Sequence, residues 1–421
     1  MRLLIIELRR SSLRWFLPLL IAVDLAAMFG RNSYWIGVWP QASAAVQLPS
    51  LYLGPALAAS AAWAAGRHGG KQLGVIAGAG ARPIWQTDVA VLASTLLYGF
   101  AAYLVGAATA AVVTVGSAGP GFLWPSYLLL GMTVLVICAS FGHALARLLN
   151  VKFLAPVVAA IASFLALKTF GDPLGLLVFY GDPQLAISSR ALLLRIALAL
   201  FIAMSCVGVT SLVLRNGWRP PPKIVALGVS AFLASALVVV ILPQAGRLVV
   251  ERPAPKDPLC SMSTPKVCVW PEDRKYLPHL SLMAERLSRI PGEMFSVPAA
   301  FYERGLRGTS QDEVYYRDFQ IIDGYLWSAA DAMAGEVLDS AVAPYYCPAA
   351  SEAEENRRTL AVWEIKVWLK SRATAAARPS LIRGGPPVDY SAIGHLITRP
   401  ESEQQAWARE RFDIIKGTRC A

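Results

Sequence analysis

The stretch Ile224–Leu242 reads IVALGVSAFLASALVVVIL, and directly after it the chain changes character. The stretch carries no charged residue, and a helix that crosses a membrane needs about 20 mostly apolar residues. Beyond Gln244 charged residues become frequent, and Arg247–Pro258 contains three prolines. The change predicts two domains in different solvents, a transmembrane domain over residues 1–245 and a water-exposed domain over residues 246–421.

Apolar runs of similar length occur throughout residues 1–245. The candidate spans are Leu13–Phe29, Val46–Ala65, Val89–Val115, Ser126–Arg147, Phe153–Phe170, Ala191–Leu214 and Ile224–Leu242. The first is short and carries Asp24, so it is the weakest of them. We therefore expect an all-α polytopic membrane bundle of about seven transmembrane helices.

The charge of the chain is concentrated in its apolar half. The net charge of +11 is typical of proteins that bind nucleic acid, but residues 1–245 hold 16 basic and five acidic residues, while residues 246–421 hold 23 of each. Since the soluble domain is neutral, we exclude nucleic acid as a partner.

The basic residues also predict an orientation. If the N-terminus is cytoplasmic, 12 of the 16 fall on cytoplasmic segments, as the positive-inside rule requires. These residues are Arg2, Arg9, Arg10, Arg14, Arg67, Lys71, Arg82, Arg147, Lys152, Arg215, Arg219 and Lys223. An odd number of spans then places residues 246–421 outside the cytoplasm.

The cysteines agree with this topology. Cys138 and Cys206 lie in apolar runs, where they serve as small apolar side chains. The soluble domain holds an even set, Cys260, Cys268, Cys347 and Cys420. In an oxidising compartment such a set predicts two disulfides of undetermined connectivity; four reduced, buried thiols are the alternative.

The soluble domain is expected to be a mostly helical α+β domain. Val267–Trp270 is typical of a short strand, and four segments have helical spacing of apolar residues. These segments are Lys275–Ile290, Tyr325–Val342, Glu352–Ala377 and Glu401–Ile415. Its zero net charge gives no electrostatic attraction for anionic ligands, and the sequence predicts no ligand for it.

Motifs for catalysis are lacking. Gly66–Lys71 contains glycines and a lysine without the spacing of a phosphate-binding loop, so we expect neither a cofactor nor ATP hydrolysis by the chain itself. Ser140 and His143 could form a hydrolase dyad, but small polar residues on one membrane helix are ordinary packing elements. His279 and His395 could share a metal ion only if the fold brings them together. We expect no metal site and no enzyme.

Ionisable residues within or near the spans are the candidate intramembrane polar site. They are Asp24, His143, Lys168 and Arg195, and each costs a few kcal/mol or more in hydrocarbon unless it is paired. One interpretation is a polar pathway or coupling element in the bundle. The other is a structural ion pair, such as Asp24 with Arg195, with Lys168 reaching to the interface.

The second cytoplasmic loop, residues 66–88, contains Arg67, Lys71 and Arg82 around an apolar stretch. A basic, partly amphipathic segment between two spans could receive a motor protein. The alternative is a connecting loop whose basic residues satisfy the positive-inside rule.

Several segments resemble the ABC-2-type permease class, especially bacterial permease-like membrane proteins with a large C-terminal extracytoplasmic domain. They are Glu7–Trp15, Phe29–Pro40, Ala62–Arg67, Ala81–Pro83, Gly119–Tyr127 and Val267–Glu272. The resemblance implies a transmembrane subunit whose cytoplasmic loop binds a separate ATPase, with Arg67, Lys71 and Arg82 in this ATPase-coupling loop. The usual permease has six spans and both termini inside, and this chain departs from it with seven expected spans.

The function expected from these observations is an ABC-type permease subunit in a bacterial plasma membrane that handles a hydrophobic or peptide-like compound. Its partners would be an ATP-binding subunit in trans and the lipid bilayer, with self-association left open. A membrane-anchored extracytoplasmic sensor or binding protein without transport activity is the alternative.

Overall fold

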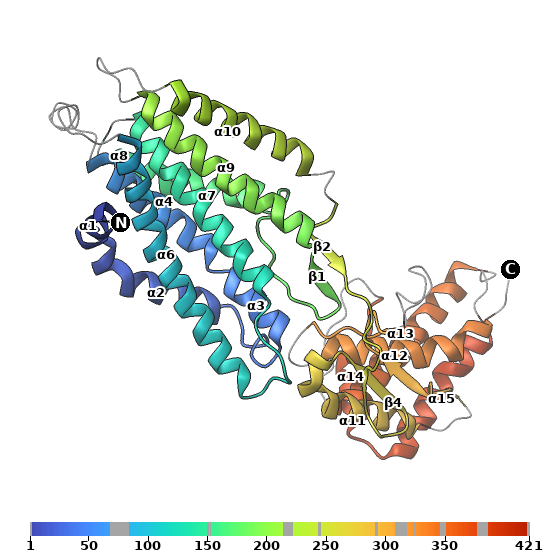
Figure 1. The fold of residues 1–421 in the computed structure, drawn as a ribbon. Helices are drawn as coiled ribbons and strands as arrows, with labels where there is room; N and C mark the ends of the chain where they lie inside the picture. Colours follow the sequence, from blue (N-terminus) through green and yellow to red (C-terminus); the bar gives the residue numbers. More distant parts are fainter. Residues whose placement is uncertain are drawn as a thin grey trace. The chain divides into compact units, whose positions relative to one another are not determined.

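The computed structural model describes residues 2–67, 84–149, 151, 153–213, 222–242, 246–290, 294–307, 318–322, 326–345, 351–376 and 386–418. The chain forms two compact units, Met1–Glu251 and Arg252–Ala421 (Figure 1). The first unit extends past residue 245 because strand β2 (Val249–Glu251) pairs antiparallel with β1 (Leu185–Ile187).

The first unit is a helical bundle, as predicted. Its helices are α1 (Arg2–Arg10), α2 (Leu13–Phe29), α3 (Trp39–Gln47), α4 (Ser50–Arg67), α6 (Ile84–Val115), α7 (Pro125–Leu149), α8 (Leu154–Phe170), α9 (Ser189–Val213) and α10 (Pro222–Ile241). Helices α9 and α10 lie side by side, and α9 also packs on α7 (Figure 1).

Helix α4 is the centre of this bundle and packs on α7, α8, α6 and α2. Most of its side chains are buried, including Ala58, Ala61 and Ala62, which are fully enclosed. On α7, a Cβ at Gly142 would lie 2.1 Å from the carbonyl oxygen of Ala58. Small residues at this contact let the two backbones approach closely, which is how membrane helices commonly associate.

We expect Gly142→Ala to destabilise the bundle by about 1–3 kcal/mol, because backbone atoms of α4 block the added methyl group. Gly66→Ala is the matched control: a Cβ at Gly66, also on a helix, meets no atom within 4 Å. The control should be neutral or gain about 0.5–1 kcal/mol from helix propensity. Thermal unfolding of the detergent-solubilised chain measures both, and equal midpoints for the two variants would contradict the close α4–α7 contact.

The expected count of seven spans is wrong for the part of the chain that the structure describes. Three helices are long and apolar enough to cross a membrane, Trp85–Val115, Pro125–Leu149 and Ser189–Gly208. A fourth span is present if α1 and α2, which meet at a 70° bend, count as one.

The other predicted spans differ from these three in length or composition. Helix α8 has only 17 residues. Helix α10 has 20 residues, of which Val229–Ile241 are fully described, so its crossing of the membrane stays a prediction. Helix α4 is rich in alanine and glycine, which add little apolar surface, and it ends on Arg67. It packs against protein along most of its length, so a high hydropathy is not required of it.

The surface of the first unit is strongly apolar. Exposed fractions reach 74% for Trp15 on α2, 72% for Phe153 before α8 and 66% for Val240 on α10. Such apolar surface is uncommon on a water-soluble monomer. Together with the long apolar helices, it indicates association with a membrane.

The second unit is a mostly helical α+β domain, as expected. Its sheet has the order β3 (Leu259–Cys260), β4 (Lys266–Val269) and β5 (Ala300–Tyr302), with β3–β4 antiparallel and β4–β5 parallel. The helices that follow or flank it are the 3₁₀ helix η2 (Pro271–Tyr276), α11 (Leu277–Ser288), α12 (Trp327–Val342), the 3₁₀ helix η3 (Ala343–Tyr345), α13 (Glu352–Thr374), α14 (Tyr390–Ile397) and α15 (Glu401–Lys416). Helix α14 was not predicted.

One of the predicted disulfides is present. Cys260 and Cys268 are directly opposite each other on β3 and β4 and are joined by a disulfide bond. Cys347 and Cys420 lie outside the described residues, so a second disulfide stays a prediction. Cys138 and Cys206 are free thiols.

Candidate functional site

A buried group of charged side chains joins α6 to α7. Asp88 lies in the first two turns of α6, and His143 and Arg147 lie on one face of α7, four residues apart. A guanidinium nitrogen of Arg147 donates to Asp88 Oδ1, and His143 Nε2 lies 3.4 Å from the same oxygen. Asp88 and His143 are fully buried and Arg147 is 6% exposed. We call these three residues the Asp88 cluster.

The cluster connects the ends of two helices. A buried ion pair contributes little net stability, but removing one partner leaves a costly unpaired charge. Asp88 therefore holds Arg147, and α6 and α7 cannot separate at these ends without exposing both charges. Helix α6 begins at Ile84, so this ion pair ties the first turns of α6 to the last turns of α7.

Of the predicted ATPase-coupling residues, only Arg67 lies in the described part of the chain. It is the last residue of α4, and its Nη1 donates to the carbonyl oxygen of Arg10 at 3.3 Å. Arg67 therefore links the end of α4 to the end of α1. Lys71 and Arg82 lie outside the described residues.

The suggested ion pair between Asp24 and Arg195 does not form. Arg195 donates from Nε to the carbonyl oxygens of Leu174 and Gly175, at 3.0 and 2.9 Å, and from Nη1 to that of Ala191 at 2.7 Å. Backbone carbonyl groups after α8 thus satisfy the guanidinium, while Asp24 lies between α2 and α6.

Lys168 and the two candidate histidines of the second unit are exposed. Lys168 is exposed at the end of α8, with Nζ 6.0 Å from the centre of the Phe164 ring. His279 on α11 and His395 on α14 are both exposed. Within the described residues, no group of three or more His, Cys, Asp or Glu side chains is placed to hold a metal ion.

The possible Ser140–His143 dyad has no catalytic geometry. Both residues are fully buried on α7, three positions apart, and Ser140 Oγ has no hydrogen-bond partner among the described residues. The His143 ring faces Asp88 instead.

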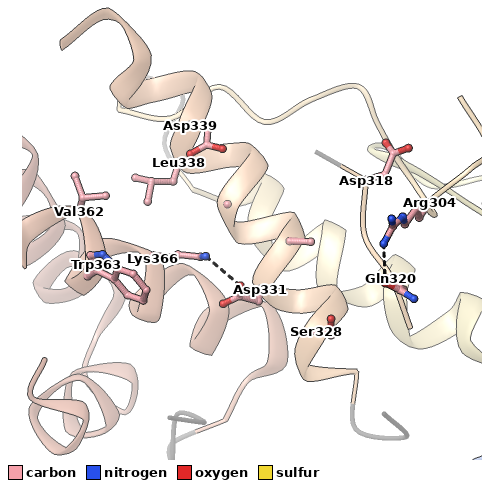
Figure 2. Close-up of a pocket in the computed structure, with 12 residues that line it drawn as sticks. Arg304, Asp318, Gln320, Ser328, Asp331, Leu338, Asp339, Val362, Trp363 and Lys366 are labelled. Atoms are coloured by element: carbon pink, nitrogen blue, oxygen red, sulfur yellow. Dashed lines mark hydrogen bonds and ion pairs between the residues drawn. The ribbon is translucent and has the colours of Figure 1, made fainter. Parts of the chain in front are cut away.

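The second unit contains a pocket of about 480 Å³ between α12 and α13 (Figure 2). One face of α12 supplies Ser328, Asp331, Gly335, Leu338 and Asp339, at helical spacing. The facing residues of α13 are Val362, Trp363 and Lys366, and Arg304, Asp318 and Gln320 complete the wall.

Charges of both signs line this pocket. Lys366 Nζ lies 3.0 Å from Asp331 Oδ2, and Arg304 Nη1 donates to Gln320 Oε1 at 3.3 Å, as the dashed lines in Figure 2 show. Burial raises the pKa of Asp318 to about 6, although the nearby Arg307 guanidinium opposes the rise. The volume suits a small molecule, and the wall suits one rich in hydrogen-bonding groups.

A second titratable site in this unit is enclosed. Glu303 is 1% exposed and Asp273 is fully buried, and the two carboxyl groups interact directly. Burial, reinforced by the charge of Asp273, raises the pKa of Glu303 well above its usual value, while the backbone N–H of Trp270, 2.9 Å from Glu303 Oε2, opposes the rise.

We expect the second unit to lose stability as the pH rises through the folded-state pKa of these groups. A raised folded pKa stabilises the fold below the unfolded pKa, and this contribution disappears as the group ionises in the folded state. For Asp318 the window runs from about pH 4 to about pH 6. Relative to Asp318→Asn, the wild type should lose on the order of 2 kcal/mol between pH 4 and pH 8. Unfolding midpoints of both proteins across this range measure the difference, and parallel curves would contradict it.

Sequence reasoning missed Asp88 and Arg147 as site residues. The available signal was an acid at the start of one span and a base at the end of the next, since antiparallel neighbours bring such ends together. The pocket had no comparable signal, because its wall comes from three separate segments. No family model, curated protein or solved structure matches this chain.

Proposed function

We propose that this chain is the transmembrane permease-like subunit of an ABC-type transport system. A separate ATPase energises it, and the transported compound is hydrophobic or peptide-like. The chain lies in a bacterial plasma membrane with a cytoplasmic N-terminus and with the unit Arg252–Ala421 on the outer side. The observation that supports this most is the Asp88 cluster, a buried ion pair at the helix ends next to the basic loop.

The cluster gives a route for motion. An ATPase bound to residues 68–83 would move the start of α6, and the Asp88–Arg147 pair would pass the displacement to α7. Helix α7 packs on α4 and α9, so the displacement would spread through the bundle. The resemblance to ABC-2-type permeases implies that Arg67, Lys71 and Arg82 would belong to the ATPase contact.

The test is co-purification of a nucleotide-binding subunit with the tagged, full-length chain from its native membranes, quantified by mass spectrometry. Arg82→Glu reverses a charge in the proposed contact, and Arg190→Glu, at the exposed start of α9, is the matched control. We expect a stoichiometric ATPase with wild type and Arg190→Glu, and a loss of most of it with Arg82→Glu. A wild-type chain that carries no nucleotide-binding subunit, with or without ATP, would overturn the proposal.

A second candidate function is that of a membrane-anchored extracytoplasmic sensor or binding protein without transport activity. The pocket between α12 and α13 favours it, because its volume of about 480 Å³ lies in the range of sites that bind small molecules. Gly335→Leu fills the pocket from α12, because a Cβ added at this position would lie 3.9 Å from Lys366 Cε and the rest of the leucine would extend beyond it. If Gly335→Leu abolishes complementation of a strain lacking the chain while Arg82→Glu does not, the sensor function is preferred.

A further inference from the structure

Asp24 on α2 and Tyr103 on α6 are two buried polar groups that the proposed function does not use. Asp24 is 1% exposed and Tyr103 is fully buried. Among the described residues, neither Asp24 Oδ1 nor the Tyr103 hydroxyl has a hydrogen-bond partner. Buried polar atoms without partners are rare, and such a pair calls for an explanation.

Glycines shape the space around both groups. A Cβ at Gly106, one turn along α6 from Tyr103, would lie 1.6 Å from Asp24 Oδ2. A Cβ at Gly131 of α7 would lie 2.2 Å from the Tyr103 hydroxyl oxygen. Asp24 and Tyr103 therefore each lie close against the backbone of a glycine, where no other side chain stands between them and that backbone. A proton is the smallest ligand that a carboxyl group packed in this way can bind or release.

Within the described residues, the helices that pack most on α2 offer no counter-ion for an ionised Asp24. Helices α6 and α4 pack on α2, and each carries one charged residue. On α6 this is Asp88, paired with Arg147, and on α4 it is Arg67, bonded to the carbonyl oxygen of Arg10. On α2 itself, Arg14 lies over the Trp15 ring, 4.6 Å from its centre. The other titratable side chains of these helices are Tyr98, whose hydroxyl donates to the Leu8 carbonyl oxygen, and the exposed Tyr52.

We propose that Asp24 and Tyr103 form a proton-binding site inside the bundle, and that its occupancy controls how closely α2 packs on α6. A neutral carboxylic acid carries an O–H group that can donate a hydrogen bond, and it places no charge among the packed helices. When the proton leaves, a carboxylate faces apolar side chains, which costs a few kcal/mol or more in a membrane helix.

Helix α2 is able to respond to this change. Its outer face is exposed, with exposed fractions of 74% for Trp15, 55% for Phe16 and 58% for Leu19, so no described part of the chain packs over it at these residues. The 70° bend between α1 and α2 separates its movement from that of α1. This proposal does not require an ATPase partner, so the experiments below test it independently of the proposed function.

The first test is labelling of the full-length wild-type chain in lipid nanodiscs with dicyclohexylcarbodiimide, an apolar reagent for protonated carboxyl groups. The carboxyl proton passes to a nitrogen of the reagent, the carboxylate oxygen bonds to its central carbon, and the O-acylisourea rearranges to a stable N-acylurea. Peptide mass spectrometry should find the adduct on Asp24, with a yield that falls several-fold from pH 6 to pH 9. Asp88, which is paired with Arg147, is the internal control and should stay unmodified.

The second test compares unfolding midpoints of wild type and Asp24→Asn, which keeps the shape of the neutral acid. We expect equal midpoints at pH 6 and a higher midpoint for Asp24→Asn at pH 9. Absence of an Asp24 adduct at every pH would overturn the proposal, as would midpoints of the two proteins that change in parallel with pH. Because the labelling uses the wild-type chain, a variant that fails to fold does not remove the test.

Discussion

Asp88→Ala is expected to lower the unfolding free energy of the membrane unit by about 3–5 kcal/mol. The substitution leaves the Arg147 guanidinium, 6% exposed, without the carboxylate that it binds on α6. A buried cation without a partner either stays at high cost or pulls the ends of α6 and α7 apart to reach water. Chemical unfolding of the chain in detergent micelles measures the loss.

A double-mutant cycle separates this effect from the loss of packing. In Asp88→Asn/Arg147→Met both charges are removed, so the double variant should recover most of the stability that Asp88→Asn alone loses. Asp172→Ala removes an exposed acid and should stay within about 0.5 kcal/mol of wild type. If Asp88→Ala behaves like Asp172→Ala, the ion pair does not hold the two helices together.

Trp270→Ala is expected to cost the second unit about 3–5 kcal/mol. Trp270 is fully buried next to the disulfide-bonded β3–β4 pair, and its Nε1 donates to the Arg304 carbonyl oxygen at 2.9 Å. The Arg252 guanidinium lies 4.7 Å from the ring centre. The variant therefore loses core volume, a hydrogen bond and a cation–π contact at once. The midpoint of thermal unfolding of the full chain, followed by protease resistance of residues 252–421, reports the effect.

Two further variants identify the cause. Trp270→Phe keeps most of the ring volume but leaves the Arg304 carbonyl group without its donor, so it should cost less than Trp270→Ala. Trp363→Ala removes a partly exposed tryptophan at the pocket and should cost the least of the three. If the Trp270→Ala protein has the same unfolding midpoint as wild type, this core does not stabilise the unit.

The helices of the second unit could be predicted closely from apolar spacing. The prediction Glu352–Ala377 became α13, Glu352–Thr374, whose ends have local causes. The Ser351 side chain accepts a hydrogen bond from the Glu354 N–H at the first turn, and Ala375 adopts a left-handed conformation after the last. Such signals lie within a few residues of the helix that they limit, so the sequence contains them.

Counting apolar runs overestimated the spans because composition alone does not distinguish a helix buried in protein from one facing lipid. Helix α4 illustrates this, since its small residues Gly54 and Ala58 allow a close approach of α7, at Cys138 and Gly142. The Asp24–Arg195 pairing was wrong for a related reason. The sequence shows which side chains have opposite charge, but not that the carbonyl groups of Leu174 and Gly175 lie nearer to Arg195.

Composition and local periodicity by themselves determined that the chain divides into an apolar basic half and a neutral half, and that both are mainly helical. They also predicted disulfides among the cysteines of residues 246–421, and Cys260 and Cys268 form one. Only the tertiary structure decided which groups meet: Asp88 with Arg147, Arg195 with the carbonyl groups of Leu174 and Gly175, and the walls of the pocket. The physical reason is that helix formation depends on neighbours three and four residues away, whereas these contacts depend on how whole helices pack.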